Sequence, residues 1–266
     1  MASALAAPAK HGFGATSRRD AWWVIPLLTF LGFGTFIVYS TWAAFQGEHF
    51  ASGPYLSPFY SPLIFSPDPA HGHHSWFGAN PAWYPWSPAF LILWAPAGFR
   101  LTCYYYRGAY YKAFWADPPA CAVAEPRNSY LGENSLPLIL QNVHRYFLPF
   151  AILLVFLLAF DTWNALWFRN ASGGVEFGIG VGTLVLALNV VFLGAYTFGC
   201  HSLRHLVGGR LDLLSKSPVR KKAYGCVGCL NQKHMRWAWF SLFWVGFSDV
   251  YVRLCSMGIW SDLRII

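Results

Sequence analysis

Five apolar stretches constrain this chain of 266 residues more than any other feature. Each is close to the ~20 residues that a helix needs to cross the ~30 Å hydrocarbon layer of a bilayer. A helix satisfies its backbone hydrogen bonds internally, as lipid requires, and no alternating ten-residue pattern indicates a β-barrel. The sequence therefore predicts an all-α integral membrane protein, a bundle of five transmembrane helices. The expected helices lie at about 21–45, 86–106, 136–160, 175–198 and 237–260.

The composition argues against a soluble fold and against a nucleic-acid partner. Charged residues make up 11% of the chain and hydrophobic residues 56%, whereas an ordinary soluble domain has roughly 25% charged residues. Nucleic-acid binding uses basic residues clustered on one face of a folded domain, but the net charge of +8 lies beside apolar stretches. The first stretch is too long for the core of a signal peptide, and no small-residue cleavage site follows it. We expect one membrane domain, residues 1–266.

The distribution of Lys and Arg predicts the orientation of the bundle. In a five-helix topology, the N-terminal tail and the second-to-third and fourth-to-fifth connections share one face. These regions contain all of the 19 basic residues except Arg169, Arg253 and Arg264. Basic residues favour the cytoplasmic side of a membrane. The N-terminus is therefore expected in the cytoplasm and the C-terminus outside.

The 46–85 loop, expected on the outer face, contains no Lys or Arg. It is rich in Pro, Gly and aromatic residues, which predicts a compact cap lying on the bundle. Its four histidines, including an HGHH run, can bind a metal, but a solvated loop accounts for them without any function. We therefore assign no chemistry to His49, His71, His73 and His74.

Histidines near the expected cytoplasmic end are more informative. His144 is expected about eight residues into the third helix, ~12 Å along it, where it could simply hydrogen-bond a carbonyl. The fourth helix ends in TFGCHSLRHLVGG, in which His201 and His205 share one helical face beside Cys200. The negative end of that helix alone could favour this pair. Histidines inside membranes are nevertheless rare enough to indicate function by default.

A second sequence, YGCVGCLNQKHMRW, places Cys226, Cys229 and His234 directly before the fifth helix. A lone CxxC is a weak signal, but thiols within reach of imidazoles are the ligands of zinc and iron–sulfur centres. Cys103 and Cys200 are expected on the same side. Because the cytoplasm is reducing, these thiols should be free or metal-bound.

Three metal centres compete for these ligands. Two stacked b-haems would need histidines at two depths, whereas one haem b could use His144 with His201 or His205. A zinc site with Cys226, Cys229 and two histidines leaves the buried histidine unexplained. A two-iron, two-sulfur cluster uses both residue types, and histidine ligation raises its potential into the range where quinones are reduced.

At this point the chain resembles a known family. The segments NVHRYF, TFGCHSLRHLVGG and YGCVGCLNQKH together resemble the membrane anchor of the actinobacterial succinate dehydrogenases, the respiratory complex II in which a membrane-embedded Rieske-type cluster replaces haem. The resemblance implies two soluble partners, a flavoprotein subunit that oxidises succinate and an iron–sulfur subunit. It also implies a location in the bacterial inner (plasma) membrane. The anchor would pass electrons from these partners through a His- and Cys-ligated 2Fe–2S cluster to menaquinone or ubiquinone, without itself catalysing succinate oxidation.

Ligands and a quinone site can be proposed on this basis. The predicted metal ligands are Cys226, Cys229, His201 and His205, with His144 and His234 as competitors. The quinone should lie between helices near the cluster, where aromatic walls meet a few polar groups. Trp and Tyr also gather at membrane interfaces without any ligand. The candidates are Tyr104, Tyr105, His144, Arg145, Tyr146, Trp237 and Trp239.

Two further features have alternatives. Asp249 and Arg253 are four residues apart on the fifth helix, which favours a structural ion pair over a proton path or an outer quinone site.

A zinc-binding transporter or assembly protein is a different class of function. Transporters usually contain internal repeats and broken helices, and no convincing repeat is found in this sequence.

Overall fold

The computed structural model describes residues 12–67, 74–126, 134–136, 138–170, 172–210 and 212–266. Lys10, His71, His73 and Arg127, which entered the predictions above, lie outside the described residues.

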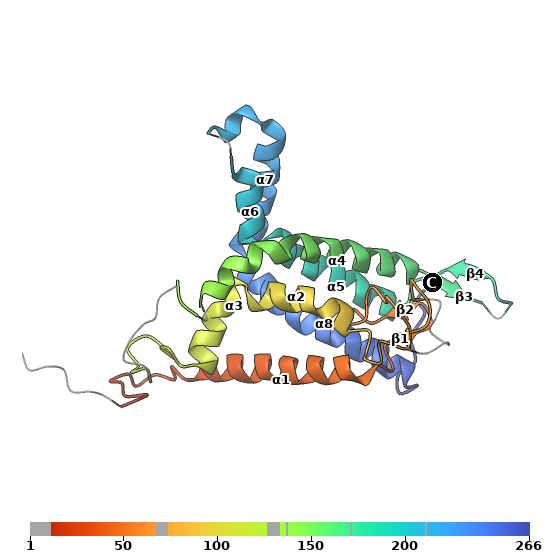
Figure 1. The fold of residues 1–266 in the computed structure, drawn as a ribbon, viewed down its shortest axis with the longest axis horizontal. Coiled ribbons are helices and arrows are strands. Elements are labelled where there is room, and N and C mark those ends of the chain that lie inside the picture. The colour runs from red at the N-terminus through yellow and green to blue at the C-terminus, as the bar shows by residue number, and fades with distance from the viewer. Residues whose placement is uncertain (1–11, 68–73, 127–133, 137, 171, 211) are drawn as a thin grey trace, which may run out of the picture.

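Helices that run along one long axis form the body of the molecule (Figure 1). Two of them, α5 and α8, are central, since α5 packs against both α8 and α4, and α4 packs against α2. Helix α1 lies at the edge of the bundle. Only 6% of the residues in its apolar 18-residue stretch are buried, against 44% in the corresponding stretch of α5. An apolar surface of this kind suits contact with lipid. The bundle comprises α1 (Val24–Gln46), α2 (Phe90–Leu101), α4 (His144–Asn164), α5 (Val181–Phe198) and α8 (His234–Ser256).

Three helical spans among the described residues are long and apolar enough to cross a membrane: Val24–Gln46, Ile139–Asn164 and Val181–Phe198. Helix α2 is apolar but has only 12 residues. Helix α8 has 23 residues and is continuous, but charged side chains such as Asp249 and Arg253 interrupt its apolar sequence. A helical membrane protein is therefore supported, while the prediction of five spanning helices stays a prediction.

The second expected helix, at 86–106, is divided in the structure. Helix α2 ends at Leu101, Cys103 is extended, and the chain continues in a new direction as α3 (Tyr104–Ala109) and the π-helix η2 (Tyr110–Phe114) (Figure 1). The Thr102 hydroxyl donates a hydrogen bond of 2.7 Å to the Gly98 carbonyl and closes the last turn of α2. The apolar stretch continues through this break, so hydropathy does not reveal it.

Two other expected helices begin later than predicted. Residues 138–143 form the 3₁₀ helix η3 (Leu138–Val143). His144 is therefore the first residue of α4 and does not lie in the third turn of the helix, as expected from the sequence. Strand β4 (Val175–Phe177) pairs antiparallel with β3 (Trp167–Arg169), and α5 starts only after Gly180. Val175 and Phe177 belong to the same apolar stretch as α5, so hydropathy does not separate the hairpin from the helix.

The 199–236 connection is helical instead of being a loop. Helices α6 (His201–Gly208) and α7 (Pro218–Gln232), joined through the 3₁₀ turn η4 (Leu214–Lys216), project sideways from the bundle (Figure 1). We call this hairpin the arm, and the end of the bundle that carries it the arm end. Arg220 stabilises it by donating hydrogen bonds to the carbonyls of Val207 and Gly209 at the C-terminus of α6, at 2.7 and 2.6 Å.

The 46–85 segment covers the opposite end of the bundle, which we call the cap end. Strands β1 (Ala51–Ser52) and β2 (Tyr55–Leu56) form a small antiparallel hairpin. Phe50, Tyr60 and Leu63 are almost completely buried against the ends of the helices. The chain's C-terminus lies at this end beside β3 and β4 (Figure 1).

Candidate functional site

His144 lies at the arm end, where α4 begins beside the break after α2. Its Nδ1 is 3.0 Å from the Thr102 hydroxyl oxygen, and its Nε2 is 3.2 Å from the Cys200 sulfur. Because Thr102 already donates its hydroxyl proton to Gly98, it accepts the proton on His144 Nδ1. The lone pair on Nε2 therefore faces Cys200. The imidazole also stacks on Phe99, with 4.4 Å between ring centroids.

His234 makes a matching pair with Cys103. As the first residue of α8, it is only 2% exposed, and its Nε2 is 3.9 Å from the Cys103 sulfur. Its ring stacks on Tyr196 at 4.9 Å and contacts Tyr105 at the same distance. Its Nδ1 is buried and has no hydrogen-bond partner among the described residues.

These four side chains form one cluster, the buried tetrad of Cys103, His144, Cys200 and His234. Each cysteine is an extended residue at a break between two helices, and each histidine is the first residue of a helix. The two cysteines belong to one cluster of buried residues, which also contains Phe99, stacked on His144, and Tyr196, stacked on His234. Cys103 and Cys200 are 2% and 1% exposed. The tetrad thus consists of two thiol–imidazole pairs that are buried at the same end of the bundle.

The donor chemistry of the tetrad can be compared with the metal centres expected above. Among the described residues, no three His, Cys, Asp or Glu side chains are grouped so as to hold one metal ion. A 2Fe–2S cluster makes a different demand, because each iron takes two protein ligands and, in Rieske centres, two cysteines and two histidines suffice. The residues of the tetrad fit that demand in type and number, and the unpartnered Nδ1 of His234 is a buried polar atom that the protein alone leaves unexplained.

The predicted ligands in the arm lie elsewhere. His201 and His205 contact each other, with 2.8 Å between their Nε2 atoms, and both rings are exposed. Partial desolvation, then the charges of His205 and Arg204, lowers the pKa of His201 below its ordinary value. Cys226 and Cys229 are exposed on α7. The structure brings the two histidines together, but within the described residues it assembles no group of three from these four.

The predicted quinone residues are dispersed over the arm end. His144 belongs to the tetrad, and Tyr105 contacts His234. Tyr104 and Tyr146 are more than 60% exposed, each beneath an arginine, Arg107 and Arg145 respectively. The remaining two candidates pack within the bundle, Trp237 against Phe192 and Trp239 against Phe33.

A cavity of about 430 Å³ lies between α1, α2, α4, α5 and α8. Its wall is mostly apolar, and its arm end is closed by Phe99, Arg100 and Tyr196. Phe99 stacks on His144 and Tyr196 on His234, so the same two rings separate the cavity from the tetrad. None of the seven predicted quinone residues is among the described residues that line it. In the sequence, this cavity is indicated by Arg100, because Arg100 is a charged residue inside an apolar stretch.

At the arm end of this cavity, Arg100 has neutral partners. Its guanidinium donates hydrogen bonds to the Tyr106 hydroxyl at 2.6 Å and to the Ser241 hydroxyl at 2.9 Å. It also lies 4.8 Å above the ring of Tyr196. These partners hold the positive charge without cancelling it, so it can stabilise negative charge that develops in the cavity.

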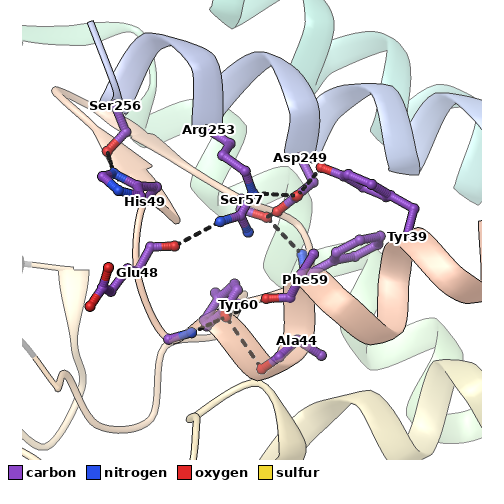
Figure 2. A network of polar contacts seen from close by, with 12 residues as sticks. Tyr39, Ala44, Glu48, His49, Ser57, Phe59, Tyr60, Asp249, Arg253 and Ser256 are labelled. Carbon is purple, nitrogen blue, oxygen red and sulfur yellow. Dashed lines mark hydrogen bonds and ion pairs between the residues drawn. The ribbon is translucent and has the colours of Figure 1, made fainter.

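Asp249 and Arg253 form a buried ion pair at the cap end, with 3.3 Å between Nε and the carboxylate (Figure 2). The Asp249 carboxylate also accepts hydrogen bonds from Tyr39 on α1, at 2.6 Å, and from Ser57 in the cap. Arg253 donates to the Glu48 carbonyl at 2.9 Å. The pair therefore joins α1, α8 and the cap, an arrangement that suits the structural role.

The fold and this site define a class, a helical membrane protein with thiols and imidazoles buried at one end of its bundle. Residues 24–258 match the family described as the actinobacterial succinate dehydrogenase subunit SdhC. The chain belongs to this family and is a membrane subunit of succinate dehydrogenase, complex II. This confirms the resemblance found in the sequence as far as the family and the enzyme complex.

A solved structure supports the assignment. One chain of the "Mycobacterium smegmatis Sdh1 complex in the apo form" is 42% identical, with a TM-score of 0.84 over 98% of each chain. No curated protein matches.

Proposed function

We propose that this chain is the membrane anchor that connects succinate oxidation in soluble subunits to the reduction of a membrane quinone in a bacterial plasma membrane. Membership in a succinate dehydrogenase family and similarity to a chain of an Sdh complex support the enzyme and the existence of partner subunits. The proposed partners are a flavoprotein and an iron–sulfur subunit. The observation that carries the proposal is the buried tetrad, placed behind two aromatic rings of an apolar cavity.

We infer the orientation of the chain in the membrane from the basic residues of the arm. Its described residues include Arg204, Arg210, Lys216, Arg220, Lys221 and Lys222. Under the positive-inside rule, the arm end faces the cytoplasm, where the soluble partners would dock. The cap end, with the C-terminus, then faces outward.

We further propose that the tetrad holds a Rieske-type 2Fe–2S cluster. Such a cluster would supply one-electron chemistry at a potential raised by histidine ligation. Cys103 and Cys200 would provide the thiolates, and His144 and His234 the imidazoles. Thr102 fixes His144 in the tautomer whose Nε2 lone pair points inward. Partners of this kind orient ligands at metal sites.

Phe99 and Tyr196 lie between the tetrad and the cavity. The volume of the cavity lies within the ~300–1,000 Å³ of small-molecule sites. Its apolar walls suit a quinone ring and the start of its tail, menaquinone or ubiquinone. Arg100 would stabilise negative charge on the quinone oxygen nearest the arm end. None of the seven residues chosen from the sequence is among the described residues that line this cavity, and we propose the cavity in their place as the quinone site.

The proposal can be tested on the complex purified through a tag on this chain. Co-purifying flavin and non-haem iron, quinone reduction by succinate and a Rieske-type EPR signal on reduction are expected. A strong Soret band would favour the haem b anchor instead. Zinc without flavin would favour the transporter or assembly protein.

A further inference from the structure

Next to the cap end of the cavity, behind Ser61, lies a carboxylate that the proposed function does not use. Ser61 lines the cavity, and its hydroxyl donates a hydrogen bond to the carboxylate of Asp161 on α4. Within the described part of the chain, this is the only side-chain hydrogen bond to that carboxylate, and no cation pairs with it.

The other carboxylates at this end are better compensated. Asp249 has Arg253, Tyr39 and Ser57 as partners. Asp262 accepts hydrogen bonds from the hydroxyls of Tyr55 and Tyr251 and from the Gly182 amide, at 2.6–2.8 Å. Asp249 therefore holds the cap, and Asp262 holds the C-terminal segment. A poorly compensated acid in a span long enough to cross a membrane indicates function.

Asp161 lies near the cap-end surface and contacts a residue that lines the cavity. It lies three residues before the end of α4 at Asn164, ~4.5 Å along the axis, and it is partly exposed at the cap end. Ser61 is only 2% exposed, so its hydroxyl connects this carboxylate to the interior. Leu158, one turn before Asp161, lines the cavity as well. The cavity thus has a cation, Arg100, at its arm end, and the Asp161 carboxylate lies behind Ser61 next to its cap end.

We propose that Asp161 and Ser61 deliver protons from the water at the cap end to the quinone in the cavity. This inference rests on the proposed function. Oxidation of succinate to fumarate in the soluble partner releases two electrons and two protons, and a quinone takes up two electrons and two protons to become the quinol. The Asp161 carboxyl gives its proton through the Ser61 hydroxyl to the reduced quinone, and regains one from water at the cap end.

The direction of proton uptake provides the test. The complete complex is reconstituted into phosphatidylcholine vesicles containing a trapped pH-sensitive dye. Externally added succinate drives only complexes whose soluble subunits face outward, so their cap end faces the lumen. During reduction of added ubiquinone-1, the lumen should become alkaline by one proton per electron, with valinomycin and K⁺ collapsing the potential. A protonophore should abolish this change without slowing turnover.

Matched variants assign the route to Asp161. Asp161→Asn retains an acceptor for Ser61 but carries no proton, and Ser61→Ala removes the connecting hydroxyl. Both should lower quinone reduction by roughly tenfold or more, the lower part of the range for general acid catalysis, while succinate oxidation with a soluble artificial acceptor is unchanged. Asp161→Glu should restore quinone reduction. Asp262→Asn, at the same end but away from the cavity, is the control and should keep both quinone reduction and luminal alkalinisation.

Two results would overturn the inference. One is full quinone reduction by the wild-type complex with no luminal pH change. The other is wild-type quinone reduction and alkalinisation in both Asp161→Asn and Ser61→Ala. Failure of the proposed function itself looks different, because the wild-type complex would then reduce the artificial acceptor but not the quinone.

Discussion

Thr102 shows how a single side chain prepares the site. Its hydroxyl closes the last turn of α2 and also accepts the proton on His144 Nδ1. Both bonds come from the residue at which α2 stops and the chain changes direction. The break that hydropathy conceals is therefore also what orients the first histidine of the tetrad.

Thr102→Val should remove both bonds, because valine keeps the shape of the side chain and lacks the hydroxyl. Loss of a partner that orients a metal ligand typically lowers activity or metal affinity 10–100-fold. We expect quinone reduction to fall by about tenfold, with a shifted EPR spectrum and unchanged reduction of an artificial acceptor. Thr162→Val removes a similar intrahelical bond, from Thr162 to Leu158, far from the tetrad. Equal effects of the two substitutions would contradict the role of Thr102.

At the scale of elements, the helices could be predicted but their breaks could not. Windows of ~20 apolar residues reveal segments that suit lipid, and the structure has helices in all five regions. No Lys, Arg, Asp or Glu and no Gly or Pro lies at 101–106 or 138–143, so the sequence there does not mark where direction or helix type changes. His144 and His234 were candidates from the sequence because histidines are rare in such surroundings.

Cys103 and Cys200 were predicted only as free or metal-bound thiols. They lie almost a hundred residues apart in the sequence, and packing of α2, α5 and α8 brings them together. Cys226 and Cys229 drew attention instead because a CxxC is visible in the sequence. A cluster of side chains assembled from four helix ends, such as the tetrad, leaves no local motif.

Gly199 shows how closely the elements approach at the tetrad. A Cβ there would lie 2.7 Å from the Ala195 carbonyl oxygen and 3.2 Å from His234 Nδ1. Gly199→Ala should therefore displace His234 and cost about 1–3 kcal/mol, as overpacking does. Thermal unfolding of the complex and its EPR spectrum would report both effects. Gly225→Ala is the matched control, since a Cβ there meets nothing within 4 Å; if both variants behaved alike, the close packing around His234 would be disproved.

At the scale of the whole molecule, the two ends of the bundle differ in chemistry. The arm end carries the tetrad, Arg100 and the basic arm, and the cap end carries Asp161, Asp249 and Asp262. The cavity between them is where electrons from one side and protons from the other would meet. This polarity makes orientation in the membrane essential to the account.

Reporter fusions test that orientation. A reporter after Ile266 should be active only if it functions outside the cytoplasm, whereas one inserted near Lys216 in the arm should report the cytoplasm. The positive-inside rule is the physical reason. The opposite pattern would place the docking face and the proton source on the wrong sides.

The central claim is that the buried tetrad, and not the CxxC of the arm, holds the redox centre. EPR spectroscopy of the reduced complex in two matched double variants tests it most directly. Cys103→Ser with Cys200→Ser should abolish the Rieske-type signal and quinone reduction, while the soluble partners still oxidise succinate with an artificial acceptor. Cys226→Ser with Cys229→Ser should retain the signal and the activity. A signal that survives in the first variant and disappears in the second would contradict the account.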